Sequence, residues 1–438
     1  MFYAEALEYI RRVGMDGSDY GIERMRELLD ALGSPDDALR IVHVAGTNGK
    51  GSVCAMLTSV LGCAGYRVGT YNSPSVLRYN ERFSVDGTPL CDDDVAKYMT
   101  VVKDTVEAEQ SRRAACGSTP AEGLRGALGR FMPTAFEIET ALALVAFRDK
   151  GCDVAVLETG LGGRWDATNA VHKKELAVIT KIGLDHCALL GNTLGEIAAE
   201  KAAIIKGDAV TCPQEAGAAE VLYPLAEVCR PAVAISQSLS GQVVEIEGER
   251  YEIPFLGRHQ LENAALAVAA AKRLAQHGFA ITESALEEGL KRAVWHARFE
   301  VLTADNVAKS PYDIAIPSNK TLVLDGAHNP QGAAALAAAM KSVLAGKRIA
   351  AVTGVLADKD YTAVMKSVVP LCERAFVVTP GSPRALDAKR LKEVCAAVAP
   401  EVPVTVCNGV KAATEQALRS DADAVVVFGS LTLFCELV

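Results

Sequence analysis

The stretch from residue 41 to residue 66, IVHVAGTNGKGSVCAMLTSVLGCAGY, constrains the fold more than any other part of the chain. Residues 41–44 form a short, largely apolar and β-branched run, which is typical of a buried strand. Apolar residues then recur at positions 53, 56, 57, 60 and 61, so the following segment has one apolar face, as in an amphipathic helix. Gly65 predicts the end of that helix. The sequence therefore predicts a strand, a glycine-rich loop and a helix in that order.

The loop between this strand and this helix has the composition of a phosphate-binding loop. Glycines let backbone N–H groups point inward, and the N-terminus of the helix adds positive potential. Lys50 adds a full charge for the terminal phosphates of a nucleotide triphosphate. An ordinary βα turn that happens to contain glycines and a lysine is the alternative. The candidate nucleotide-binding residues are Gly46, Thr47, Asn48, Gly49, Lys50, Gly51 and Ser52.

Composition restricts the class of protein. The chain has 438 residues, and 50% of them are hydrophobic, so we expect two or three domains with large cores. A net charge of −9 argues against a general nucleic-acid or anionic-membrane binder. The 12 cysteines are scattered without a Cys-x-x-Cys pair, which favours free thiols over a zinc site or a disulfide framework. Because no apolar run is long enough to span a membrane, we expect a soluble, cytoplasmic protein.

Strands and helices alternate along most of the chain. The pattern predicts an α/β fold, with a P-loop domain built on a doubly wound, mostly parallel sheet and a second, smaller Rossmann-like α/β domain. We place the two domains at residues 1–297 and 298–438. Residues 105–131 show weak periodicity, and we interpret them as a mobile connection or insertion. Strands are expected at 67–71, 154–157, 176–182 and from 295, and helices at 3–13, 20–32, 193–206, 257–278 and 282–293.

Three polar residues stand out in the predicted first domain. Glu158 ends a buried strand, and an unpaired buried carboxylate is costly, so Glu158 is a candidate magnesium ligand. An ion pair with Arg164 is the alternative. His186 follows a strand, but a single histidine is more often structural than a ligand. Lys201 lies on the helix expected at 193–206, where the alternative is a solvated surface lysine.

Six segments, taken together, resemble the signature of one family. In chain order they are GTNGKGS, NSPSVLRYNER, LETGLGGRWDATN, TKIGLDHCALLGNTLGEIAAEKAAIIK, GRHQLENAALA and LDGAHNPQG. The chain resembles folylpolyglutamate synthase/dihydrofolate synthase, within the Mur ligase superfamily, from residue 41 to about residue 430. The resemblance implies an ATP-dependent ligase that adds L-glutamate to tetrahydrofolate and, in dihydrofolate synthesis, to dihydropteroate.

The resemblance also implies roles for individual residues. The catalytic groups would be Lys50, His186, Lys201 and Arg298. ATP would be bound by the glycine loop, by Asn263 on the adenine side, and across the domain cleft by Arg298 and Asp325. The magnesium ligands would be Ser73, Glu158 and His186, and Lys201 would carry a carbamate. The substrate contacts would be Arg82, Phe136, Asp166, His328 and Asn329.

The implied chemistry has a physical rationale. A carboxylate resists attack by an amine, so ATP would first convert it to an acyl phosphate, which the glutamate amine then attacks. We expect the glutamate site between the domains, near His328 and Asn329, with Asp358, Lys359 and Arg384 as weaker candidates.

Two other functions remain open from the sequence. One is a Mur-type ligase that acts on another carboxylate substrate, which we disfavour because the chain begins almost directly with the expected ATPase domain. The other is a nucleotide-dependent switch without ligase activity. The expected partners are a folate or dihydropteroate and L-glutamate, with no nucleic acid and no membrane, and we expect a monomer.

Overall fold

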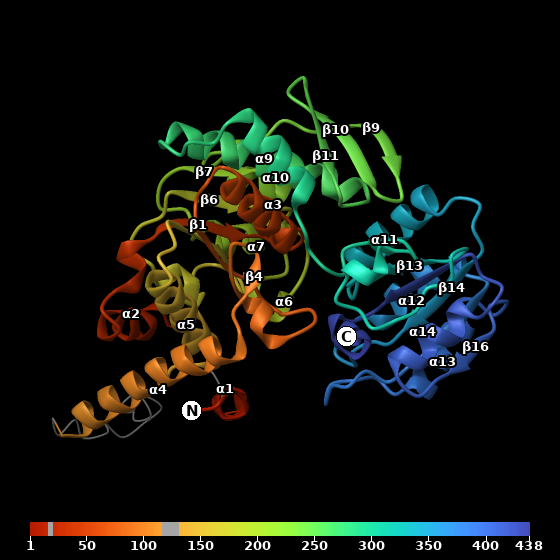
Figure 1. Ribbon diagram of the computed structural model, residues 1–438, viewed down its shortest axis with the longest axis horizontal. Helices are drawn as coiled ribbons and strands as arrows, with labels where there is room; N and C mark the ends of the chain where they lie inside the picture. Colours follow the sequence, from red (N-terminus) through yellow and green to blue (C-terminus); the bar gives the residue numbers. More distant parts are fainter. Residues whose placement is uncertain (16–20, 116–130) are drawn as a thin grey trace. The chain divides into compact units, whose positions relative to one another are not determined.

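The computed structural model describes residues 1–15, 21–115 and 131–438, which fall into two compact units (Figure 1). Unit 1 comprises residues 1–75, 80–231 and 265–293, and unit 2 comprises residues 76–79, 232–264 and 294–438. The last segment of unit 2 begins four residues before the boundary that we predicted. The units differ from the predicted division mainly in segment 232–264, because its contacts lie within unit 2.

Unit 1 contains an eight-stranded sheet in the order β4-β3-β2-β5-β1-β6-β7-β8. Strands β2, β5, β1, β6, β7 and β8 are parallel, and β3 and β4 add an antiparallel edge. This confirms the mostly parallel sheet predicted from the alternating pattern. The bounds are β1 Arg40–Ala45, β2 Val68–Tyr71, β3 Phe83–Val85, β4 Thr88–Pro89, β5 Val154–Glu158, β6 Leu176–Ile179, β7 Ala209–Thr211 and β8 Glu227–Val228.

Helices cover both faces of this sheet. On β2, the Thr70 hydroxyl lies 2.7 Å from the hydroxyl of Thr58 on α3, whereas a Cβ atom on Gly69 would lie 2.4 Å from Phe147 on α5. Neighbouring strand residues point to opposite faces, so α3 and α5 lie on opposite sides of the sheet. The helices are α1 Tyr3–Met15, α2 Ile22–Ala31, α3 Lys50–Cys63, α4 Asp92–Ala115, α5 Ala135–Asp149, α6 Cys187–Leu190, α7 Leu194–Ala202, α8 Ala216–Leu222, α9 Arg258–Gln276 and α10 Glu283–Arg292, with α9 shared between the units.

Unit 2 contains a six-stranded sheet in the order β12-β13-β17-β14-β15-β16, in which only β12 is antiparallel to its neighbour. A separate antiparallel sheet has the order β11-β10-β9. The strands are β9 Val233–Ser238, β10 Gly241–Ile246, β11 Glu249–Ile253, β12 Glu300–Leu302, β13 Thr321–Leu324, β14 Ile349–Thr353, β15 Arg374–Val377, β16 Val404–Val406 and β17 Ala424–Phe428. The helices are α11 Pro330–Val343, α12 Tyr361–Val368, α13 Ala388–Val398 and α14 Val410–Leu418.

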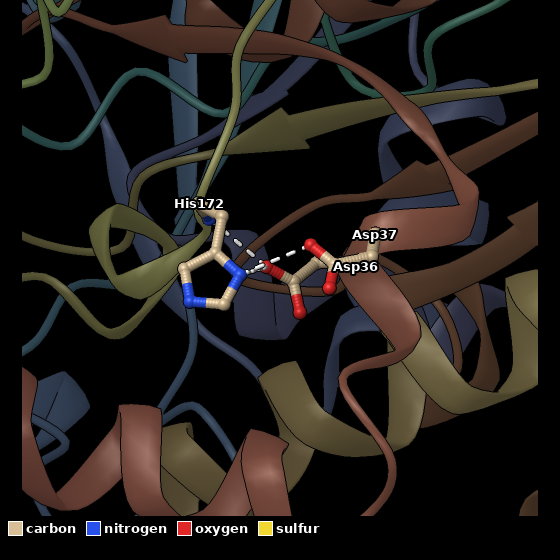
Figure 2. Close-up of side chains that lie close together, drawn as sticks. All are labelled: Asp36, Asp37 and His172. Carbon is tan, nitrogen blue, oxygen red and sulfur yellow. Dashed lines mark hydrogen bonds and ion pairs between the residues drawn. The ribbon is translucent and has the colours of Figure 1, made fainter.

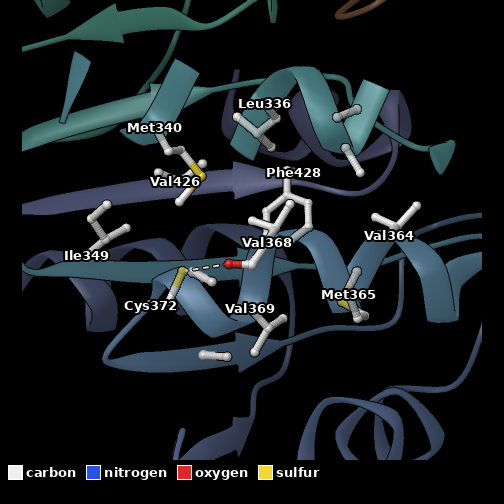
Figure 3. Packing of buried hydrophobic residues seen from close by; sticks show 14 of the residues in the cluster. Leu336, Met340, Ile349, Val364, Met365, Val368, Val369, Cys372, Val426 and Phe428 are labelled. Carbon is white, nitrogen blue, oxygen red and sulfur yellow. Dashed lines mark hydrogen bonds between the residues drawn. The ribbon is translucent and has the colours of Figure 1, made fainter. Parts of the chain in front are cut away.

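The central strand β17 divides the interior of unit 2 into two apolar cores. Val426 and Phe428 belong to the core beneath α11 and α12, where Leu336 and Val364 also lie (Figure 3). Val425 and Val427 belong to the opposite core, beneath α14. A buried parallel strand contributes to both faces, which explains why its sequence is a continuous apolar run and does not alternate.

Three predicted elements differ from the structure. Residues 105–115 are not a connection, because they are the last turns of α4, where Arg112 pairs with Glu109 of the same helix and Arg113 pairs with Glu27 of α2. Residues 116–130 of that predicted connection lie outside the described part of the chain. The strand expected from residue 295 begins only at Glu300. The helix expected at 193–206 ends at Ala202.

The described part of the chain contains no helix that is both long and apolar enough to cross a membrane. The cysteines that the structure describes are free, and most of them are buried, which agrees with the thiols predicted from their spacing.

Replacing Leu336 with alanine should lower the free energy of unfolding of unit 2 by about 2–5 kcal/mol, because the side chain is 1% exposed and its loss leaves a cavity. Urea denaturation of the full chain measures this. The control is Val406→Ala on β16, where the side chain is 38% exposed and the change should cost little. Equal effects of the two substitutions would contradict the described core.

Candidate active site

The glycine-rich loop joins β1 to α3 and is fixed against the end of β6. Gly46 has a φ of +151°, and a Cβ atom there would lie 1.8 Å from the Thr180 hydroxyl oxygen. The backbone N–H groups of Thr47 and Asn48 donate to the carbonyl of Lys181 at 3.0 and 3.2 Å. Gly46 is therefore required by both its backbone conformation and the space available to it. The predicted strand, loop and helix are all present.

Lys50, Ser73 and Glu158 come together beside this loop. The Lys50 Nζ lies 3.9 Å from Glu158 Oε1, and the Ser73 N–H donates to Glu158 Oε2 at 3.3 Å. Glu158 is only 5% exposed, so its charge depends on these partners. Arg164, the alternative partner considered for Glu158, pairs with Glu200 at 2.9 Å. The buried carboxylate is thus directed toward the loop.

Lys201 lies on α7, which begins with a capping box formed by Thr193 and Glu196. The lysine is 5% exposed, so the interpretation as a solvated surface residue is wrong. Burial, with the nearby charge of Lys50 acting in the same direction, lowers the pKa of Lys201 to about 7. A lysine with this pKa is about half neutral at neutral pH. The neutral amine is the form that can add carbon dioxide.

The residues around Glu158 fit a magnesium ion in part. Magnesium prefers oxygen ligands, and the Glu158 carboxylate and Ser73 supply them next to each other. His186 precedes α6 with a φ of +51°, and its side chain is 47% exposed. Its Nε2 lies 3.8 Å from Asp185 Oδ2. The place of His186 as a third ligand stays a prediction.

A pocket of about 550 Å³ in unit 1 includes Ser73 in its wall. The same wall contains Arg82, Phe136 and Asp166, so the structure brings together the substrate residues predicted for this part of the chain. Ser73 is therefore shared between the pocket and the group formed by Lys50 and Glu158. The wall also contains charged residues of its own, Arg82 and Asp166 among them.

Two arginines in the pocket wall are held by buried glutamates of α5. Arg82 donates to Glu139 at 2.6 Å, and Arg24 pairs with Glu137 at 2.9 Å. Both glutamates are less than a tenth exposed, so these pairs fix the arginine side chains. Sequence reasoning missed Arg24, which looks like a surface residue of an amphipathic helix. Glu137 could have been noticed in the sequence, because it stands three residues after Thr134, which is the spacing of the capping box that begins α5.

Aromatic and aliphatic side chains form another part of the pocket wall. The Phe136 ring lies so close to Gly160 that a Cβ atom there would be 2.6 Å from the ring. Trp165 and Leu189 also belong to the wall, although they are 52% and 62% exposed. Large exposed apolar side chains beside a pocket are typical of a binding site for an apolar or aromatic group. Their role as pocket residues was not predicted.

In unit 2, Arg298 lies on a turn between two residues with positive φ, Ala297 at +55° and Phe299 at +50°. Asp325 holds this turn, because Oδ2 accepts the Phe299 N–H and Oδ1 accepts the Ala327 N–H, both at 2.8 Å. Burial raises the pKa of Asp325 to about 6, while Arg298 opposes that rise. The structure thus joins Arg298 and Asp325 in one arrangement. Their contact with ATP stays a prediction.

The other predicted residues of unit 2 have specific local partners. His328 Nδ1 lies 2.7 Å from the carbonyl of Gly326, so Nδ1 carries the proton. The Asn329 side-chain oxygen caps α11. The Asn263 amide donates to Gln260 at 2.8 Å on α9. The roles predicted for these residues toward ATP and substrate are untested by these contacts.

Unit 2 also contains the weaker candidates for the glutamate site and one residue that was not predicted. Arg384 pairs with Asp358 at 3.1 Å on the surface, and Lys359 is next to this pair in the chain. His259, which sequence reasoning did not single out, is half-buried, and desolvation lowers its pKa to about 4, with the charge of Arg298 acting in the same direction. It is a neutral neighbour of Arg298 at physiological pH.

A further polar cluster in unit 1 consists of Asp36, Asp37 and His172 (Figure 2). His172 Nδ1 lies 3.0 Å from Asp37 Oδ1, and the His172 N–H donates to Asp36 at 2.9 Å. Arg26 also binds Asp36 through two hydrogen bonds, at 2.8 and 3.1 Å. The guanidinium already neutralises the buried carboxylate, so we interpret this cluster as a structural ion pair and not as a metal site.

Comparison with known proteins identifies the family. A family model described as "Mur ligase, glutamate ligase domain" matches residues 314–431. The dihydrofolate synthase/folylpolyglutamate synthase of Bacillus subtilis is 35% identical over 89% of this chain and 88% of that protein. The chain belongs to the folylpolyglutamate synthase/dihydrofolate synthase family. It is therefore a ligase of the Mur superfamily.

Solved structures of this family share the fold. Folylpolyglutamate synthase from Thermotoga maritima has a TM-score of 0.81 and 30% identity, and the match covers 98% of this chain and 94% of that one. The E. coli FolC structure in complex with DHPP and ADP has a TM-score of 0.79 and 27% identity, with coverage of 99% and 96%. The α/β fold with two sheet domains is thus the fold of the folylpolyglutamate synthase family.

Replacing Lys201 with methionine should flatten the pH dependence of stability. The folded pKa of about 7 lies below the unfolded value of 10.5, so between these values the unfolded chain binds more protons and stability rises with pH. The lysine therefore contributes about 1.4 kcal/mol per pH unit to the slope over that range. Urea denaturation from pH 7.5 to 9.5 in carbonate-free buffer measures it. An unchanged slope in Lys201→Met would show that the amine is charged in the folded protein.

Proposed function

We propose that this protein uses ATP to add L-glutamate to a folate, and also to dihydropteroate, through an acyl phosphate. The observation that carries the proposal is the position of Ser73. Its N–H binds Glu158, whose carboxylate lies 3.9 Å from Lys50, and Ser73 also lines the pocket of about 550 Å³. A substrate carboxylate at this end of the pocket would lie beside phosphates held by the loop. The names of the curated relatives and the DHPP and ADP of the FolC complex support this assignment.

The loop from Gly46 to Ser52 would bind the phosphates of ATP through its N–H groups and Lys50. Ser73 and Glu158, with His186 as a third candidate, would hold Mg²⁺, which would neutralise phosphate charge and orient the γ-phosphate. Lys50 adds a fixed positive charge on the same side. Together these groups favour the charge that develops as the γ-phosphoryl group moves.

The reaction has two steps. An oxygen of the substrate carboxylate attacks the γ-phosphorus, the bond to the β-phosphate oxygen breaks, and ADP leaves. The neutral glutamate amine then attacks the acyl carbon, loses a proton and displaces phosphate. Holding the reacting groups in line provides much of the rate enhancement, since the chain itself needs no covalent intermediate.

The pocket would hold the aromatic part of the folate or dihydropteroate. Phe136 offers an apolar wall, and the Asp166 carboxylate can accept hydrogen bonds from heterocyclic N–H groups. Arg82, held by Glu139, would contact an anionic or carbonyl group. The pocket combines a few fixed polar groups with apolar walls, which suits a flat, amphipathic ligand.

Unit 2 would supply the remaining contacts. We propose that Arg298 stabilises the transferring phosphoryl group and that Asn263 contacts the adenine. Asp325 would act mainly by holding the turn that carries Arg298. His328 and Asn329, and more weakly Asp358, Lys359 and Arg384, are proposed for L-glutamate.

Lys50→Ala should lower the rate of ligation at saturating ATP by at least about 100-fold, because it removes a charge that stabilises the phosphoryl transition state. ADP release, measured with L-glutamate and either dihydropteroate or tetrahydrofolate, follows the reaction. The matched control is Lys103→Ala on α4, whose lysine pairs with Glu107 at 2.8 Å.

Near-normal turnover by folded Lys50→Ala would refute the assignment of the loop. In the wild type, ADP release should require both the pterin substrate and glutamate. Slow release that neither substrate changes would favour the nucleotide-dependent switch, and activity on one pterin substrate alone would show which synthase activity is present.

We also propose that Lys201 carries a carbamate. Lys201→Ala should then reduce ligation severely, and acetate should partly restore it by supplying a carboxylate in the space left by the side chain. Acetate should not stimulate the wild type, which is the control. A high-resolution structure of the active, ATP-bound enzyme with an unmodified amine at Lys201 would overturn the proposal.

A further inference from the structure

Asp166, in the wall of the pocket, is held from behind by two buried residues. Its Oδ1 accepts the Thr168 hydroxyl at 2.5 Å and the Thr168 N–H at 3.0 Å. The Thr168 hydroxyl oxygen in turn lies 2.7 Å from His43 Nε2 on β1. His43 and Thr168 have no exposed surface, and Asp166 is 5% exposed. The three side chains form a continuous hydrogen-bonded chain from the middle of the sheet to the pocket.

The chemistry of the three groups fixes the direction of this chain. An ionised carboxylate can only accept, so the Thr168 hydroxyl must donate its proton to Asp166. The hydroxyl oxygen can then accept, so His43 Nε2 must donate to it. His43 is therefore the Nε2–H tautomer, with a bare lone pair on Nδ1. Within the described residues, that Nδ1 has no hydrogen-bond partner.

A histidine at this position needs an explanation. Its neighbours on β1, Val42 and Val44, are apolar and fully buried, and an aliphatic residue at 43 would also suit the strand without leaving a buried polar atom unpaired. Burial holds the pKa of His43 well below its usual range, and the charges of Lys174 and Lys206 act in the same direction, so the ring is neutral. Leaving Nδ1 unpaired costs free energy, and we interpret the hydrogen bond from the Nε2–H to the Thr168 hydroxyl as what offsets that cost.

We propose that His43 is a positioning residue for substrate binding, acting through Thr168 to hold Asp166 as a fixed hydrogen-bond acceptor in the pocket. The inference rests on the proposed function, because it assigns Asp166 to the pterin end of the substrate. Asp166 Oδ2 accepts the Leu161 N–H at 2.9 Å, so both carboxylate oxygens are oriented by the protein. Removing His43 frees the Thr168 hydroxyl to rotate, so Oδ1 is then held in a fixed direction only by the Thr168 N–H.

Two pairs of variants test the hydrogen-bonded connection from His43 through Thr168 to Asp166. His43→Leu and Thr168→Val each remove a link, whereas His43→Gln keeps an N–H donor and Thr168→Ser keeps the hydroxyl. Thr70→Val is the matched control, because the buried Thr70 hydroxyl makes a bond of the same 2.7 Å length to Thr58 in the same unit but outside this chain. Thermal unfolding of every variant shows whether it is folded.

We expect the KM for dihydropteroate to rise about tenfold in His43→Leu and Thr168→Val, while the KM for ATP stays unchanged. Thr168→Ser should bind like the wild type, and His43→Gln should be less impaired than His43→Leu. Thr70→Val should lose a similar amount of stability with no change in either KM. An active wild type whose KM for dihydropteroate is kept in both His43→Leu and Thr168→Val would overturn the inference.

The tautomer of His43 gives a readout that needs no ligase activity. Nitrogen-15 NMR of the histidine-labelled protein at neutral pH should show His43 protonated at Nε2 and unprotonated at Nδ1. A proton on Nδ1 instead of Nε2 would mean that His43 cannot donate to the Thr168 hydroxyl, and it would overturn the inference. By contrast, a wild type with the Nε2–H tautomer that neither binds nor turns over dihydropteroate or tetrahydrofolate would refute the proposed function itself, which separates the two failures.

Discussion

The parallel pairing of β1 with β5 is the constraint on which the site depends. In this register Val44 lies opposite Glu158, so the end of β5 is placed where β1 gives way to the glycine loop. The carboxyl ends of parallel strands collect loops at one edge, and here that edge brings a lysine, a carboxylate and a buried amine close together. A shift of one residue would turn Glu158 toward the other face of the sheet.

The charged groups at this edge act on one another. Glu158 has Lys50 nearby, while Lys201 is buried with a second cation close enough to lower its pKa. Lys50 and Lys201 thus act on each other as like charges, while the carboxylates of Asp185 and Asp166 act on Lys201 in the opposite sense. A pair of lysines suits polyanionic ligands, and the repulsion between them also favours any change that removes the charge from Lys201. The same two lysines therefore underlie both the nucleotide assignment and the proposed carbamate.

Local patterns in the sequence predicted most elements, because each was encoded within a few residues. The glycine loop, the buried strand that ends at Glu158 and the helix expected at 282–293 are of this kind. Burial across the fold was harder to predict. Nothing near Lys201 in the sequence distinguishes it from a surface lysine, since its environment is made by the ends of other strands.

The remaining differences also have physical causes. The turns of α4 after Val106, its last buried residue, carry no apolar face, so periodicity could not identify residues 105–115 as helix. Arg24 reaches the pocket only because α2 packs near α5, which a pattern within one helix cannot show. The segment 232–264 belongs to unit 2 although the chain returns to unit 1 after it, with the rest of α9 and with α10. His43 was hidden because it occupies one position in an otherwise apolar strand.

The contact between Gly46 and Thr180 has a consequence for how this sequence can vary. A methyl group at position 46 would overlap the Thr180 hydroxyl, so the loop cannot accept a side chain there unless β6 gives up its own at position 180. Even that exchange would leave the new residue in a backbone conformation suited to glycine. A substitution at position 46 can therefore be accommodated only after the side chain at position 180 has become smaller. A designer who transplants this loop into another parallel sheet has to carry the end of the neighbouring strand with it.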